Sequence, residues 1–156
     1  MRYSSMAEDI VVDLPDEAAT LSLGASLSKF SGIIFLNGEL GAGKTTLVRG
    51  YLQALGYKGA VKSPTYTLIE PYEVAGRRLL HLDIYRLADP LELEALAIRD
   101  ELDPDNTLLV EWPQRAQGYL GEPDIEINLL YSGDSRQARI VAKVSLASQI
   151  AKVISG

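Results

Sequence analysis

The chain has 156 residues, 47% of them hydrophobic and 23% charged, which is typical of a single globular domain and excludes a disordered or fibrous protein. Its 15 Lys and Arg residues against 21 Asp and Glu residues give a net charge of −6, which argues against a surface that binds nucleic acid by neutralising phosphates. The absence of cysteine excludes disulfides and thiolate sites, and the single histidine excludes a multi-histidine zinc site.

The sequence shows no boundary between two domains. We therefore read residues 1–156 as a single domain whose core runs from about residue 10 to residue 144. The longest apolar runs, such as residues 32–36, are far shorter than the ~20 residues that cross a bilayer, and the N-terminus lacks a signal pattern. We expect a cytoplasmic protein that does not bind membranes.

The first third of the chain predicts a helix, a strand, a loop and a second helix. The first helix is expected to begin near residues 14–17, because proline and acidic residues favour a helix start. Residues 33–36 form a continuous apolar run, which is typical of a central strand covered on both faces. After a glycine-rich turn, apolar residues recur at helical spacing from Lys44 until Gly56, a suitable C-terminal cap. The first helix is expected to bury Leu23, Leu27 and Phe30.

The rest of the chain predicts mostly strands. A helix containing Leu91, Leu93, Leu96 and Ile98 is expected among them, and a short amphipathic helix is expected after residue 145. Strands are predicted at residues 67–72, 78–83, 108–112, 125–129 and 138–144, the last two antiparallel. Together these elements predict an α/β protein with a three-layer fold, in which a mainly parallel central sheet carries antiparallel C-terminal strands.

The glycine-rich turn carries the clearest chemical signal. Residues 38–45 match the pattern G-x-x-x-x-G-K-[ST], in which the backbone curls so that successive amides point at phosphate oxygens. Lys44 would contact the β and γ phosphates, and the Thr45 hydroxyl would bind Mg²⁺. The alternative is a turn that merely joins strand and helix. The candidate nucleotide-binding residues are Glu39, Leu40, Gly41, Ala42, Gly43, Lys44, Thr45 and Thr46.

A phosphate site of this kind also needs an acid at the end of a neighbouring strand. Asp83 and Glu111 both end apolar strands, where a carboxylate is otherwise costly to place. Each could instead be a helix cap or a solvated strand end. Spacing alone does not rank the two acids.

Three other residues are weaker candidates. Thr65, in the segment 63–67, could sense the γ-phosphate, or its segment could simply be a turn. Arg86 could stabilise transferring phosphate charge or pair with a surface acid. Trp112 could pack near a nucleotide or in the core, and His81 is expected to be a hydrogen-bonded structural residue.

Several segments together resemble one family. The chain is similar to the TsaE family, the bacterial ATPase component of the tRNA threonylcarbamoyladenosine system. The glycine-rich motif is generic, whereas the other motifs in this order are specific to that family. The segments are Leu-Pro-Asp-Glu at 14–17, the glycine-rich motif at 38–46, Val-Lys-Ser-Pro-Thr-Tyr-Thr-Leu at 61–68, His-Leu-Asp-Ile-Tyr-Arg-Leu-Ala-Asp-Pro at 81–90 and Val-Glu-Trp-Pro at 110–113.

The resemblance implies a P-loop fold that uses ATP and Mg²⁺ as its ligands. It matches Thr45 and Glu111 to the family's magnesium positions and Asp83 to the acid needed for hydrolysis, with Lys44 as the second catalytic residue. It also matches Thr65 to a nucleotide-sensing loop and Glu17 to a residue lining the nucleotide site.

The resemblance further implies that the protein hydrolyses ATP while cycling on a complex of TsaD and TsaB. The protein would then contact tRNA only indirectly, through that complex. This agrees with its net negative charge, which does not favour direct binding of nucleic acid. The alternative is a small-molecule kinase, but such kinases usually carry an arginine-rich lid, whereas the arginines here are scattered. A GTP switch lacks support because the chain has no Asn-Lys-x-Asp segment.

Overall fold

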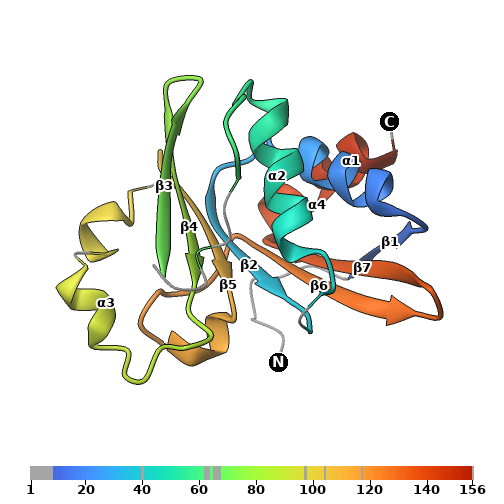
Figure 1. The fold of residues 1–156 in the computed structure, drawn as a ribbon. Coiled ribbons are helices and arrows are strands. Elements are labelled where there is room, and N and C mark those ends of the chain that lie inside the picture. Colours follow the sequence, from blue (N-terminus) through green and yellow to red (C-terminus); the bar gives the residue numbers. More distant parts are fainter. Residues whose placement is uncertain are drawn as a thin grey trace.

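The computed structural model describes residues 9–39, 41–61, 64, 68–96, 98–103, 105–116 and 118–155. Within them, seven strands form one sheet with helices on both of its faces (Figure 1). No helix in these segments is both long and apolar enough to span a membrane. The elements are β1 (Ile10–Leu14), α1 (Glu17–Leu27), β2 (Gly32–Asn37), α2 (Lys44–Ala54), β3 (Ile69–Val74), β4 (Arg77–Asp83), α3 (Glu92–Ala95), η1 (Ile98–Glu101), β5 (Thr107–Glu111), η2 (Pro113–Ala116), β6 (Ile125–Ser132), β7 (Ser135–Ala142) and α4 (Val144–Ser155).

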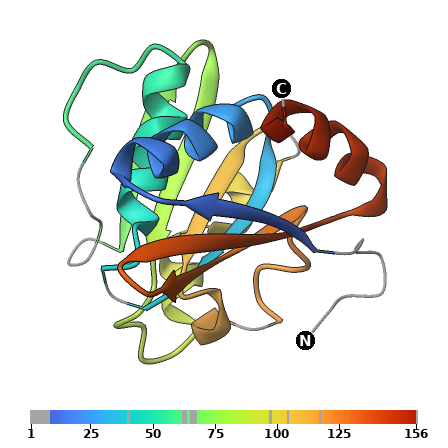
Figure 2. The same cartoon turned by 90° about the vertical axis from the view of Figure 1, so that its right-hand side faces the viewer.

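The sheet is parallel at its centre and antiparallel at its edges. Its strand order is β1-β7-β6-β2-β5-β4-β3. The neighbours β6-β2, β2-β5 and β5-β4 are parallel, whereas β6-β7, β1-β7 and β3-β4 are antiparallel. The predicted α/β class is confirmed, including the antiparallel pair near the C-terminus. The sequence did not predict β1, which lies beside β7 at one edge of the sheet (Figure 2).

The two long helices of the N-terminal third begin and end close to the predicted positions. Asp16 caps α1, because its Oδ1 accepts a hydrogen bond of 2.8 Å from the Ala19 amide. Helix α2 ends just before Gly56, whose φ of +98° is the left-handed conformation of a C-terminal cap. Helix α1 buries Leu23 and Leu27, as predicted.

The helix predicted around residues 91–98 is shorter than expected. The structure has a four-residue helix, α3, followed by the separate 3-10 turn η1. Leu93 and Ile98 are buried, but Leu91 and Leu96 are exposed by 63% and 42%. The four apolar side chains therefore do not share the single buried face that the prediction of one helix required.

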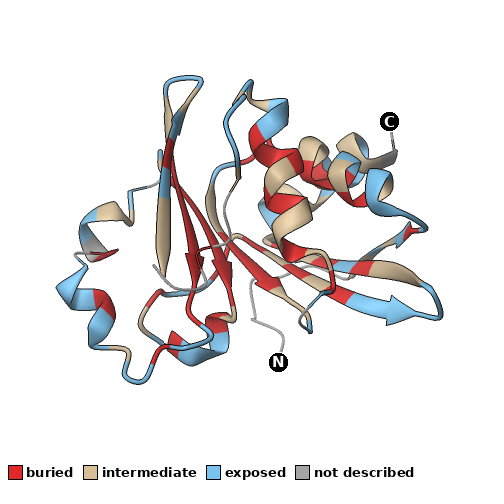
Figure 3. Cartoon of the chain, viewed as in Figure 1, coloured by how far each residue is buried: buried red, intermediate tan, exposed pale blue. Residues whose placement is uncertain are grey.

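Two apolar layers form the core, one on each side of the central strands. Ile34 and Leu36 of β2 pack in the layer covered by α1 and α2, whereas Phe35 points to the layer that contains Leu93 of α3. This alternation is the two-residue period of a strand. Strand β5 is consequently buried along its whole length and β4 along most of it (Figure 3).

The parallel centre of the sheet determines where the site lies. In the β4–β5 pair, Asp83 is opposite Glu111, and in the β2–β5 pair Leu36 is opposite Glu111. Parallel strands end at the same edge of a sheet, so both acids lie at the edge where β2 continues into the glycine-rich loop.

Candidate phosphate-binding site

The loop between β2 and α2 presents backbone amides without side chains in front of them. Gly41 and Gly43 have φ values of +81° and +108°, a conformation that side chains rarely adopt. Gly43 is the N-cap of α2 and has no side-chain capping bond, so the first amides of the helix are left for another acceptor. At Gly38, an added Cβ would lie 3.0 Å from the Leu129 carbonyl oxygen, which leaves little room for a side chain. These features fit an anion held by the loop and the helix N-terminus.

Lys44, the first residue of α2, lies buried at the mouth of this loop. Its Nζ donates a hydrogen bond of 2.6 Å to the Gly38 carbonyl oxygen and lies 4.1 Å from the centroid of the Trp112 ring. Burial lowers the pKa of Lys44, and the nearby charges of Glu111 and Asp83 oppose that shift. The site therefore holds a cation next to two carboxyl groups.

Asp83 and Glu111 are buried at the ends of β4 and β5. Burial raises the pKa of Asp83, although a hydrogen bond from the Tyr85 amide counteracts it. Glu111 is bonded through Oε2 to His81 Nε2, 2.5 Å away. His81, interpreted from the sequence as a hydrogen-bonded structural residue, makes that bond here. The structure thus brings together the two acids that spacing alone did not rank.

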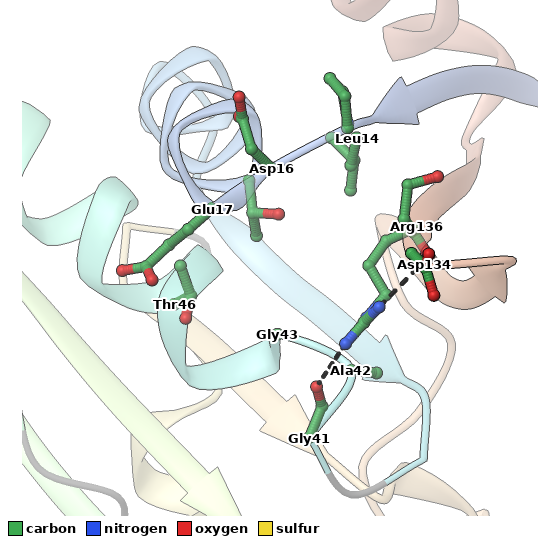
Figure 4. A pocket seen from close by; sticks show the side chains of 12 residues that line it. Leu14, Asp16, Glu17, Gly41, Ala42, Gly43, Thr46, Asp134 and Arg136 are labelled. Carbon is green, nitrogen blue, oxygen red and sulfur yellow. Dashed lines mark hydrogen bonds between the residues drawn. The ribbon is translucent and has the colours of Figure 1, made fainter.

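A hollow of about 240 Å³ lies on another side of the loop, between the start of α1 and the β6–β7 turn (Figure 4). Glu17 of α1 lies at this hollow and forms an exposed ion pair of 2.7 Å with Arg49. Lys44, Asp83 and Glu111 are not among the lining residues. Sequence candidates that do line the hollow are Glu17, Gly41, Ala42, Gly43 and Thr46.

The residues of this hollow that sequence reasoning missed include Asp134, Ser135 and Arg136. Arg136 donates a hydrogen bond of 3.4 Å to the Gly41 carbonyl oxygen, and its guanidinium lies 4.0 Å from the Tyr131 ring centroid. The Ser-Gly-Asp-Ser run at residues 132–135 is a turn signal, and it lies in the turn of the antiparallel pair that the sequence predicted. Its position beside the glycine-rich loop depends on the sheet order, which no local pattern reveals.

The remaining sequence candidates lie at different places relative to the site, and some lie outside the described residues. Leu40 and Thr65 lie outside the described residues, and Glu39 and Arg86 are exposed. Thr45 lies in the first turn of α2. Among the described residues, no group of three or more His, Asp or Glu side chains could hold a metal by itself. Thr45 and Glu111 still fit Mg²⁺, because this ion usually takes one or two protein ligands and completes its shell with phosphate oxygens and water.

Fold and site together define an α/β protein in which a glycine-rich loop joins a central strand to a helix beside two buried acids. The sequence model of the family described as "Threonylcarbamoyl adenosine biosynthesis protein TsaE" matches residues 14–140. This chain belongs to the TsaE family, and the resemblance inferred from the sequence motifs is confirmed.

Two relatives place the chain within that family, and one solved structure shares its fold. The protein named tRNA threonylcarbamoyladenosine biosynthesis protein TsaE from Haemophilus influenzae is 43% identical over 156 residues, which cover 95% of this chain and 99% of the relative. The protein of the same name from Bacillus subtilis is 33% identical over 124 residues, or 79% of this chain and 77% of the relative. The crystal structure of Bacillus subtilis YdiB matches the fold with a TM-score of 0.78 and 22% identity, covering 95% of each chain.

Proposed function

We propose that this protein binds and hydrolyses ATP with Mg²⁺ and, like the relatives whose names state it, serves tRNA threonylcarbamoyladenosine biosynthesis. We propose further that it does so by cycling on the TsaD–TsaB complex. One observation carries the biochemical part of this proposal: the ammonium of Lys44 bonds to the first glycine of the loop at the sheet edge where Asp83 and Glu111 end. A cation, free helix amides and two acids are the groups that phosphoryl transfer needs.

The nucleotide would lie across the loop. Its terminal phosphates would contact the amides of Gly41 and Gly43 and the ammonium of Lys44, while the nucleoside would occupy the hollow between Glu17 and Arg136. The placement is supported by the lining of that hollow, which shares Gly41, Ala42 and Gly43 with the phosphate loop. Arg136 already contacts the loop carbonyl at Gly41 and is suited to a contact with the base or ribose.

Hydrolysis would depend on four side chains that share three tasks. Thr45 and Glu111 would hold Mg²⁺, which when bound neutralises phosphate charge. Lys44 would stabilise the charge that develops as water oxygen bonds to the γ-phosphorus and the bond to the β–γ bridging oxygen breaks. Asp83 would accept the proton of that water, because burial raises its pKa toward the range useful for a general base.

We expect the isolated protein to hydrolyse ATP slowly. A well-placed arginine raises the rates of such enzymes by ~10³ to 10⁵, and Arg86, the candidate after β4, has an exposed side chain. Docking on a partner would then change the rate. The role of the protein would be a conformational one, in which ATP favours the docked state and hydrolysis ends it.

Phosphate release from ATP, measured with and without the TsaD–TsaB complex, tests the proposal. We expect slow release alone, a changed rate with the complex, and association with the complex that depends on ATP in a pull-down. Asp83→Asn should reduce hydrolysis by roughly 10² to 10⁴ while retaining ATP binding, whereas Lys44→Ala should reduce hydrolysis and also weaken ATP binding by about tenfold or more. Transfer of label from ATP to a small-molecule acceptor would instead indicate the kinase alternative, and association independent of nucleotide would contradict the switch.

A further inference from the structure

Trp112 has an unusual backbone conformation at the edge of the site. Its φ is +59°, a value that costs energy for a bulky side chain. The turn that follows, η2, fixes this conformation, because the Arg115 amide donates to the Trp112 carbonyl oxygen at 3.1 Å and Pro113 is buried. The chain thus makes a sharp turn immediately after Glu111, and this turn directs the indole ring toward Lys44.

The ring lies between two groups of the site. Lys44 Nζ is 4.1 Å from its centroid, within the range of a cation–π interaction. The other group is Tyr85, which follows β4. Its ring centroid lies 4.8 Å from the Trp112 ring centroid, and the two ring planes are tilted by 51°. The Arg115 guanidinium in turn lies 5.4 Å from the Tyr85 ring centroid. Trp112 is therefore supported by Tyr85 where it meets the ammonium.

The carboxylates of Asp83 and Glu111 are alternative partners for the ammonium of Lys44. Asp83 and Glu111 are near enough for their charges to act on Lys44, yet no ion pair between described residues joins Lys44 to either acid. Its Nζ instead bonds to the Gly38 carbonyl and rests against the Trp112 ring. A flexible lysine without the ring could swing onto the carboxylates, where it would be lost to phosphate and would compete with a magnesium ion.

We propose that Trp112 is a positioning residue that holds the Lys44 ammonium on the glycine-rich loop and away from Asp83 and Glu111. The proposal rests on the proposed function, since it explains how both the cation and the acids remain available for magnesium triphosphate. The proposed contact between the Trp112 indole and the Lys44 ammonium exists in the ligand-free protein. It can therefore be tested with no nucleotide present.

The first experiment uses fluorescence of the ligand-free, full-length chain, in which Trp112 is the only tryptophan. Lys44→Met keeps the length of the side chain but removes its charge, and it should change the emission maximum and intensity of Trp112. Lys58→Met, the matched control, removes a charge at an exposed position and should leave the spectrum as in the wild type. Identical spectra for the wild type and Lys44→Met would overturn the proposal.

The second experiment measures the binding of magnesium tripolyphosphate and of Mg·ATP by calorimetry. Trp112→Leu should weaken binding of both probes by between about twofold and thirtyfold, and Trp112→Phe, which retains a ring face, by less. Tyr57→Leu, which removes an edge contact of 5.1 Å with Tyr72, should bind like the wild type. Wild-type affinity in Trp112→Leu, or equal losses in Trp112→Leu and Trp112→Phe, would overturn the proposal.

The two experiments separate this inference from the proposed function. A wild-type protein that binds neither probe would contradict the proposed function, while the ligand-free spectra would still decide whether Lys44 contacts Trp112. A wild-type protein that binds both probes, together with a Trp112→Leu variant of equal affinity, would contradict the inference alone.

Discussion

His81 Nε2 and Glu111 Oε2 share a hydrogen bond of 2.5 Å, and both side chains are buried. The two residues lie on neighbouring parallel strands, with His81 two positions before Asp83, the residue opposite Glu111. A buried carboxylate is costly unless it is hydrogen-bonded, so this bond helps to keep Glu111 at the site edge in one orientation.

The bond predicts that His81→Leu destabilises the protein. The substitution would leave a buried carboxylate without this partner, at a cost of about 1–3 kcal/mol in the free energy of unfolding. His81→Gln should cost less, because the Gln amide can reach the same carboxylate. Urea denaturation of the three proteins provides the measurement, and equal stabilities of the Leu and Gln variants would contradict this account of the bond.

Close packing between α1 and α2 depends on two glycines. A Cβ added at Gly50 would lie 2.2 Å from the Leu21 carbonyl oxygen, and one added at Gly24 would lie 2.1 Å from the Leu47 carbonyl oxygen. Gly50→Ala should therefore destabilise the fold by about 1–3 kcal/mol, although alanine is the better helix former. Gln53→Ala, on the exposed side of α2, serves as the control and should change thermal stability little. A Gly50→Ala variant as stable as the wild type would show that the helices can separate without cost.

Arg77 joins the helical layer to the end of the sheet opposite the site. Its guanidinium donates at 2.7 Å to the Ser28 carbonyl oxygen and the Tyr51 hydroxyl, and at 3.2 Å to Thr107 Oγ1. Arg77→Met should lower the free energy of unfolding by about 2–4 kcal/mol, because buried acceptors lose a charged donor. Arg78→Met removes more exposed ion pairs and should cost at most about 1 kcal/mol. Comparable decreases in the free energy of unfolding of Arg77→Met and Arg78→Met would contradict this structural role of Arg77.

Glu126 gives the expected pH dependence of stability. It lines a hollow of about 640 Å³ with Phe35, Pro113 and Asn128, and burial raises its pKa above the ordinary value of 4.5, against the effect of a hydrogen bond with Asn128. The folded state therefore keeps this proton to a higher pH than the unfolded state, so the contribution of Glu126 to stability falls as pH rises through 4.5 and above. Glu126→Gln removes that loss. Its stability relative to the wild type should increase from pH 4 to pH 8 in chemical denaturation, and a difference independent of pH would contradict the shift.

The parts of the site that are local in sequence could be predicted from the sequence. The loop, Lys44 and Thr45 follow one strand directly, and the glycine pattern identifies them. Asp83 and Glu111 each end an apolar run, and parallel strands bring such ends to one edge of a sheet. These arguments need only strand direction and the two-residue period.

The rest depends on contacts between distant segments. Arg136 reaches Gly41 only because β7 returns beside β6, and β1 pairs with β7 across more than a hundred residues. The left-handed backbone conformation of Trp112 could not be predicted, because a tryptophan in the sequence does not indicate a positive φ. Gly50 would count as a weak point of a helix, whereas the structure makes it the place where two helices touch.

Calorimetric titration of Mg·ATP into the full-length protein tests the central claim most directly. We predict saturable binding of one nucleotide per chain, and a loss of affinity of about tenfold or more in Lys44→Ala, because a charged contact to phosphate is removed. Absence of binding heat from folded wild-type protein, confirmed at a second temperature, would contradict the account, as would Lys44→Ala binding as tightly as the wild type.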